Sequence, residues 1–317
     1  MTSFLIKNIQ LVDSGRIFYA DLLTKNDRIE KIAPLISTLK SDFIEINGEG
    51  KIMIPGAIDV HVHFREPGLT HKADIFSESR AAVAGGITSY IEMPNTKPKT
   101  TNIEALKAKF DLAQKNSIAN YSFYMGATNT NWDELIKALE IASPGIKVFL
   151  GASTGNMLVD DQHMLERIFK DFPGIIMVHS EDEAIINANL AKAKKKFGAQ
   201  IPFEMHADIR SADACYKATH EAINWAEKYN SRLHIAHLST EDEIQLLNKS
   251  IDLKNKRITS EVCSHHLWFD KNDYSEHKGE IKCNPSIKEE KHKEALLKAA
   301  LNGTIDLISS DHAPHTK

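Results

Sequence analysis

Side chains that could bind a metal ion follow several apolar segments of this sequence. His61 and His63 form a His-x-His pair at the end of residues 52–62. Alternate residues of a strand face the same way, so both imidazoles could bind one ion. Three further candidate ligands follow later apolar segments: His179, His237 and Asp311. Imidazole and carboxylate ligands suit a divalent metal ion, and such ions activate water for hydrolysis.

Lys147 is a charged residue inside the apolar segment Ile146-Lys147-Val148-Phe149-Leu150. An ammonium group is costly to bury without a partner. One interpretation is a lysine at the start of a strand, whose amine reaches solvent while its stem is buried. The other is an amine that has taken up carbon dioxide. The resulting carbamate has two oxygens and could bridge two cations.

The elements that would position these residues alternate from about Lys51 onward. Expected strands are residues 52–62, 88–94, 120–126, 146–151, 174–179, 232–238, 257–262 and 304–309. Expected helices are residues 76–84, 103–116, 132–142, 162–171, 183–197, 212–229, 241–248 and 288–301. Eight such units over ~250 residues predict an α/β fold, a (β/α)8 TIM barrel, whose active site lies where the strands end. The alternative is a doubly wound open sheet, but no glycine-rich fingerprint follows the first strand.

The first fifty residues predict a separate module, because short strands alternate there with Asn, Asp, Ser and Gly turn signals. We therefore expect a small β-rich module over residues 1–51 and a barrel over residues 52–317. The chain stops at Lys317, soon after the eighth expected strand. A closing helix and strands returning to the β-rich module would be needed, so we expect the barrel to lack its C-terminal end.

Composition narrows the class of protein. The chain has 317 residues, of which 42% are hydrophobic and 26% charged, and this balance excludes intrinsic disorder. A net charge of -4 gives no support for binding nucleic acid or an anionic membrane. The 3 cysteines have no CxxC spacing and cannot all pair, which favours a reducing compartment. Without a signal-peptide core or an apolar run of ~20 residues, a cytoplasmic protein is expected.

Four motifs resemble those of the cyclic amidohydrolases, specifically the dihydroorotases. They are HVHFREPG (61–68), EMPNT (92–96), KVFLGASTGNM (147–157) and DHAPH (311–315). The resemblance runs from about Lys51 to the end, and the β-rich start is similar to the small module of those enzymes. It implies a metal-dependent hydrolase of cyclic amides.

For the metal site, the resemblance implies two divalent ions, expected to be Zn²⁺. His61 and His63 would bind the more buried ion, and His179 and His237 the more exposed one. A carboxylated Lys147 would bridge the two ions. Asp311 would bind the first ion and act as the proton shuttle for a metal-bridging hydroxide. Some family members use an aspartate as the bridge, so Asp160 and Asp161 remain alternatives to Lys147.

For the substrate, the resemblance implies (S)-dihydroorotate, hydrolysed reversibly to N-carbamoyl-L-aspartate in pyrimidine synthesis. Arg65, Asn95 and His315 would contact the ring carboxylate, and Asn284 the ring amide. A surface ion pair for Arg65 and a turn position for Asn95 are the simpler interpretations. Related hydantoinases, dihydropyrimidinases and allantoinases act on rings without this carboxylate, and they are the nearest alternatives. An inactive homologue that serves as a scaffold for a partner is a third.

The remaining histidines show no ligand spacing. His265 and His266 begin the seventh loop, and His312 is expected to support the neighbouring Asp311. The expected partner is a small-molecule substrate, and a homodimer is compatible with the sequence.

Overall fold

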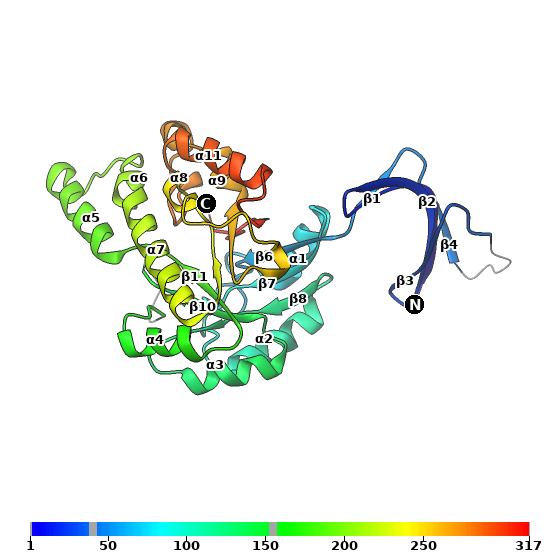
Figure 1. The fold of residues 1–317 in the computed structure, drawn as a ribbon, viewed down its shortest axis with the longest axis horizontal. Coiled ribbons are helices and arrows are strands. Elements are labelled where there is room, and N and C mark those ends of the chain that lie inside the picture. Colours follow the sequence, from blue (N-terminus) through cyan, green and yellow to red (C-terminus); the bar gives the residue numbers. More distant parts are fainter. Residues whose placement is uncertain (1, 38–42, 152–156, 317) are drawn as a thin grey trace. The chain divides into compact units, whose positions relative to one another are not determined.

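The computed structural model describes residues 2–37, 43–151 and 157–316, and the chain divides into two compact units between Ala57 and Ile58 (Figure 1). Within the described residues, no helix combines the length and the apolar character that crossing a membrane requires.

The first unit is a mixed β-sheet. Its strands are β1 (Ser3–Asp13), β2 (Arg16–Lys25), β3 (Arg28–Ala33), β4 (Phe43–Asn47) and β5 (Ile52–Met53). They are ordered β3-β2-β1-β4, and β5 pairs with β1. Positive φ angles at Asn26 and Asp27 form the tight turn between β2 and β3, as two-residue hairpins require. The buried carboxylate of Asp21 accepts the backbone N–H groups of Asn8 and Ile36, each at 2.9 Å.

The second unit is built on parallel strands. They are β6 (Ala57–Val62), β7 (Ile87–Glu92), β8 (Asn120–Phe123), β9 (Met125–Gly126), β10 (Gly145–Phe149), β11 (Ile175–His179), β12 (Arg232–Ile235), β13 (Ile258–Cys263) and β14 (Leu307–Ser309). β6, β7 and β8 form one sheet, and β9 to β14 form the other in sequence order. Only Tyr124 separates β8 from β9, so these two make one strand position. A parallel bridge between Val62 and His312 connects the first strand to the last. The predicted (β/α)8 architecture is confirmed.

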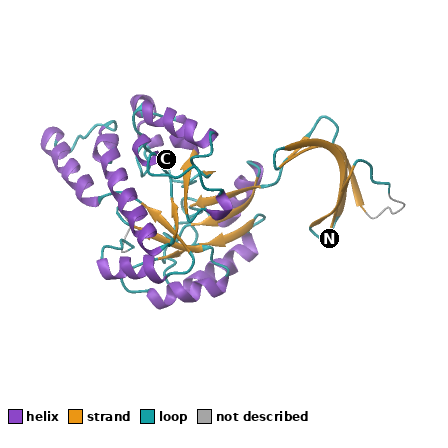
Figure 2. Cartoon of the chain, viewed as in Figure 1, coloured by secondary structure: helices purple, strands orange, loops and turns teal. Residues whose placement is uncertain are grey.

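Helices lie outside the strands, as Figure 2 shows in purple and orange. They are α1 (Ile75–Ala84), α2 (Ile103–Asn116), α3 (Trp132–Ala138), α4 (Gln162–Asp171), α5 (Glu183–Phe197), α6 (Met205–Ile209), α7 (Ala212–Tyr229), α8 (Glu241–Ile244), α9 (Ser264–Trp268), α10 (Tyr274–His277) and α11 (Glu290–Leu301). Short 3₁₀ turns occupy Leu139–Ile141, Leu253–Asn255, Lys271–Asp273 and Lys278–Ile281. Asn, Asp and Thr side chains cap several N-termini by accepting backbone N–H groups that the helix leaves unpaired. Apolar side chains from both layers form the main core.

One expected strand is divided. Residues 52–62 were expected to form a single barrel strand, but β5 pairs with β1 in the first unit and β6 starts the barrel. Pro55 lies between them, and proline has no N–H group to donate to a sheet. The start of the apolar segment therefore belongs to the sheet of the first unit, and its end forms the first barrel strand.

Candidate active site

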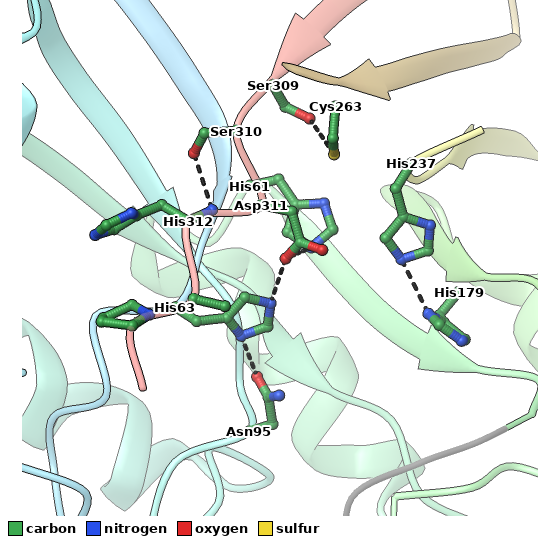
Figure 3. A network of polar contacts seen from close by, with 12 residues as sticks. His61, His63, Asn95, His179, His237, Cys263, Ser309, Ser310, Asp311 and His312 are labelled. Carbon is green, nitrogen blue, oxygen red and sulfur yellow. Dashed lines mark hydrogen bonds and ion pairs between the residues drawn. The ribbon is translucent and has the colours of Figure 1, made fainter. Parts of the chain in front are cut away.

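The first histidine pair meets a carboxylate at the end of β6. His61 is the fifth residue of this strand, and His63 follows it. Their Nε2 atoms lie 3.3 and 2.9 Å from the same oxygen, Oδ1 of Asp311, which follows β14 (Figure 3). Burial alone would raise the pKa of Asp311, but the two imidazoles outweigh it and hold that pKa well below its usual range. The site therefore contains an ionised carboxylate between two imidazoles.

The second pair joins the ends of β11 and β12. His179 Nδ1 lies 2.9 Å from Nε2 of His237, and both side chains are buried (Figure 3). Burial lowers the pKa of each imidazole, which keeps the neutral form with a free lone pair. The Nδ1 atom of His237 has no hydrogen-bond partner. Two neutral imidazoles facing each other are suited to bind one cation.

The two pairs are close together. The ring centroids of His61 and His237 are 5.3 Å apart. One ligand atom from each of His61, His237 and Asp311 lies within 4.8 Å of the others. Imidazole nitrogens and carboxylate oxygens are the donors that Zn²⁺ and similar divalent ions prefer. The residues therefore fit a metal ion.

Lys147 lies on β10, next to the strand that ends in His179. Its side chain is 1% exposed, and the Nζ atom has no hydrogen-bond partner. Burial lowers the pKa of this amine to about 8. Such an amine is neutral in a substantial fraction of molecules near that pH, which makes it reactive toward carbon dioxide.

The two aspartates that could replace Lys147 as a bridge are engaged elsewhere. Asp161 caps α4 by accepting the N–H of Met164 at 2.7 Å. Asp160 accepts the side-chain amide of Asn129 at 2.7 Å, and both carboxylates are exposed. Residues 152–156 of the motif that begins at Lys147 lie outside the described residues.

The expected substrate-binding residues are only partly brought together. Arg65 is 7% exposed, and its guanidinium donates to the carbonyl of Pro314 at 3.0 Å and lies 3.4 Å from Nδ1 of His315. Asn95 instead contacts a candidate metal ligand, because its Oδ1 lies 2.8 Å from Nδ1 of His63. Asn284 is exposed on the loop before α11.

The sequence suggests that His312 supports the neighbouring Asp311, but the side chain of His312 contacts another residue. Its imidazole pairs with Glu78 of α1 and points away from the other histidines (Figure 3). Its backbone carbonyl instead accepts the N–H of His63 at 2.8 Å, because the two strands are paired there. His266 is buried, and its Nε2 donates to the carbonyl of Pro285 at 3.1 Å.

Glu261, in the middle of β13, was missed from the sequence. Its Oε1 lies 2.5 Å from Nδ1 of His61, and its Oε2 lies 3.2 Å from Nε2 of His234. Burial alone would raise the pKa of Glu261, but these histidines hold it well below its usual value. The contact of this carboxylate with Nδ1 orients the ring of His61 so that Nε2 faces Asp311. The only sequence signal was a glutamate beside Val262 near the end of an expected strand.

Comparisons with known proteins show the family to which this chain belongs. A family model described as "Amidohydrolase family" matches residues 52–317. A dihydroorotase from Methanosarcina acetivorans is 31% identical over 318 residues, which cover 98% of this chain and 67% of that protein. One from Carboxydothermus hydrogenoformans is 34% identical over 313 residues, covering 97% and 70%.

Solved structures include similar folds. The L-hydantoinase (dihydropyrimidinase) from Arthrobacter aurescens has a TM-score of 0.92 and 26% identity, over 99% of this chain and 70% of that one. The dihydropyrimidinase from Brevibacillus agri, at 22% identity and a TM-score of 0.87 over 99% and 69%, supports the fold alone. The family model covers most of this chain, and relatives above 30% identity span nearly all of it. The chain therefore belongs to the amidohydrolase family, as a cyclic amidohydrolase similar to dihydroorotases.

Proposed function

We propose that this enzyme catalyses the reversible hydrolysis of (S)-dihydroorotate to N-carbamoyl-L-aspartate, the dihydroorotase reaction of pyrimidine synthesis. The observation that carries the proposal is the buried guanidinium of Arg65, two residues after His63 and beside His315. Dihydroorotate has a ring carboxylate, and a guanidinium can bind a carboxylate through two parallel hydrogen bonds. The sequence relatives named dihydroorotases support the same substrate.

The residues that would hold two divalent ions, expected to be Zn²⁺, fall into two groups. His61, His63 and Asp311 would bind one ion, and His179 and His237 the other. A carboxylated Lys147 would bridge them, since its buried amine has no hydrogen-bond partner. When bound, the ions supply a hydroxide near neutral pH and polarise the substrate carbonyl.

The side chains of this protein would transfer the proton and bind the substrate. Asp311 is ionised and can accept a proton at its carboxylate, then return it to the ring nitrogen that leaves. Arg65 would bind and orient the substrate carboxylate, with Asn284 on the ring amide. Asn95 would orient His63 through the contact between Oδ1 and Nδ1, as well as face the substrate.

A hydantoinase or dihydropyrimidinase is the second candidate, because the fold matches the Arthrobacter aurescens enzyme at a TM-score of 0.92. Such enzymes act on rings that lack the carboxylate. The buried Arg65 would then have no anionic substrate group to bind, and this argues for dihydroorotate.

The test is to measure kcat/KM of the zinc-loaded chain for dihydroorotate, dihydrouracil and hydantoin, together with zinc content. We expect two zinc ions per chain and a clear preference for dihydroorotate. A preference for the neutral rings would assign the chain to the hydantoinases. A protein that binds no zinc and turns over none of the three would indicate an inactive homologue.

A further inference from the structure

Behind the candidate ligand His179 lies a buried ion pair. Glu181 follows His179 by two residues, and its side chain is completely buried. Its Oε2 lies 2.8 Å from Nε2 of His179 and also accepts a hydrogen bond from Nη1 of Arg210. Arg210 immediately follows α6, and its side chain is 11% exposed. One carboxylate oxygen therefore joins the imidazole to a guanidinium.

This pair determines which nitrogen of His179 carries the lone pair. The completely buried carboxylate of Glu181 forms an ion pair with the guanidinium of Arg210, a permanent cation. A carboxylate paired with a guanidinium is an acceptor, so it accepts a hydrogen bond from Nε2–H of His179. The lone pair of the neutral imidazole is left on Nδ1, the atom that lies 2.9 Å from His237 Nε2. That lone pair accepts Nε2–H of His237, and both facing nitrogens could bind one cation once the His237 proton moves to Nδ1, which has no hydrogen-bond partner.

The backbone around Arg210 reaches a second part of the site. The carbonyl of Arg210 accepts a hydrogen bond from the hydroxyl of Ser286 at 2.9 Å. One turn earlier, His206 Nε2 donates to the carbonyl of Cys283 at 2.8 Å. These two bonds attach α6 to the loop 283–286, which carries the exposed Asn284.

We propose that Arg210 is a positioning residue that serves both halves of the site. Its guanidinium, through Glu181, fixes the tautomer and orientation of His179, and its carbonyl anchors the loop that carries Asn284. The inference rests on the proposed function, because it assigns His179 to a metal ion and Asn284 to the substrate. Partners of this kind, which orient a ligand without touching the metal, commonly change metal affinity 10–100-fold when removed.

The first experiment measures zinc binding to the Arg210→Met variant by competition with a chromogenic chelator. The methionine keeps the apolar stem but removes the cation, so Glu181 loses its partner. We expect one of the two zinc ions to bind about 10–100-fold more weakly while the other keeps its affinity. Arg210→Lys keeps a cation near Glu181 and should recover part of the loss.

The control is a second buried ion pair, Lys256 with Asp306, at 2.6 Å and with side chains 4% and 5% exposed. It precedes β13 and β14, at the opposite strand ends from the site. Lys256→Met should leave both zinc affinities unchanged. If Lys256→Met weakens zinc binding as much as Arg210→Met, or if Arg210→Met changes neither affinity, the role of Arg210 at His179 is refuted.

The second experiment tests the loop with Ser286→Ala, which removes the hydroxyl that donates to Arg210. We expect KM for dihydroorotate to rise about threefold to tenfold, with kcat and the zinc content of the parent. An unchanged KM, or a loss of zinc, would overturn the role of the Arg210 carbonyl. A parent chain that binds two zinc ions but prefers neutral rings contradicts the proposed function instead, and the zinc result for Arg210→Met then still decides the role at His179.

Discussion

The amine of Lys147 is buried and has no hydrogen-bond partner, which favours its neutral form. The amine has a pKa lowered by burial to about 8, and only the neutral amine reacts with carbon dioxide. We predict that zinc-loaded protein kept in ¹³C-bicarbonate shows a carbamate carbon signal by NMR. During assembly of the site from apo-protein, the rate of carbamate formation should increase as pH rises toward 8, because the neutral fraction increases.

The matched control for this prediction is Lys109, another lysine with a side chain 1% exposed. Its Nζ donates to Glu92 at 2.8 Å and to the carbonyl of Met93 at 3.0 Å, so its amine is occupied. Lys109→Met should keep the carbamate signal, and Lys147→Ala should lose both the signal and most activity. Short carboxylic acids should restore part of the activity of Lys147→Ala. A signal that survives Lys147→Ala would show that another lysine carries the carbamate.

Arg65 allows the substrate class to be tested at a single residue. Without its guanidinium, the substrate carboxylate would enter a partly desolvated pocket unpaired, which typically costs about 2–5 kcal/mol, or on the order of a hundredfold or more in kcat/KM. We predict that Arg65→Met loses this much on dihydroorotate and little on dihydrouracil, with zinc content intact. Equal losses on both rings would mean that Arg65 supports the fold through Pro314 and not the substrate.

At the scale of elements, the start of α4 allows a test of whether Asp161 caps a helix or bridges the metal ions. Asp161 accepts the N–H of Met164 as the N-cap of this helix. Replacing such a cap with alanine costs about 1 kcal/mol of stability. We predict that Asp161→Ala lowers the free energy of unfolding by this amount in a urea titration and keeps two zinc ions. Loss of a zinc ion in Asp161→Ala or Asp160→Ala would instead identify a bridging aspartate.

Elements with a strong local pattern were predictable from the sequence. Residues 103–116, 162–171, 183–197 and 212–229 are helices with the expected bounds, and Asn or Asp side chains cap the N-termini of the first three. The five-residue helix α6 was missed, since a single turn buries too little to leave a periodic pattern. The division of residues 52–62 was also missed, although Pro55 marks the place.

The candidate metal ligands at the strand ends could be predicted from the sequence, but the glutamates that contact them could not. His61 and Asp311 are 250 positions apart and still meet, because the barrel rule brings strand ends to one face. Glu261 contacts His61 and His234 on other strands, whereas Glu181 contacts His179, two residues before it in the chain. The first contacts depend on how the strands are aligned and the second on side-chain orientation, and the sequence pattern contains neither.

Across the whole molecule, the candidate ligands come from strand ends spread around the barrel. His61, His179, His237 and Asp311 follow or end β6, β11, β12 and β14. A metal ion bound here would connect elements that the chain joins only through long crossovers. Binding to the folded state alone stabilises that state in proportion to ligand concentration and affinity. The first unit contributes none of these candidate ligands, since it ends at Ala57.

Amide hydrogen exchange, measured on the zinc-loaded and on the chelator-treated chain, tests this distribution of candidate ligands. Amide groups open locally with different free energies, so a ligand protects mainly the regions that it connects. We expect removal of zinc to accelerate exchange at the ends of β6, β11, β12 and β14 and to leave β1, β2 and β3 unchanged. The sheet of the first unit is thus an internal control in the same sample. Equal acceleration in both units would mean that zinc stabilises the chain globally, and no change at β11 and β12 would remove His179 and His237 from the ligand set.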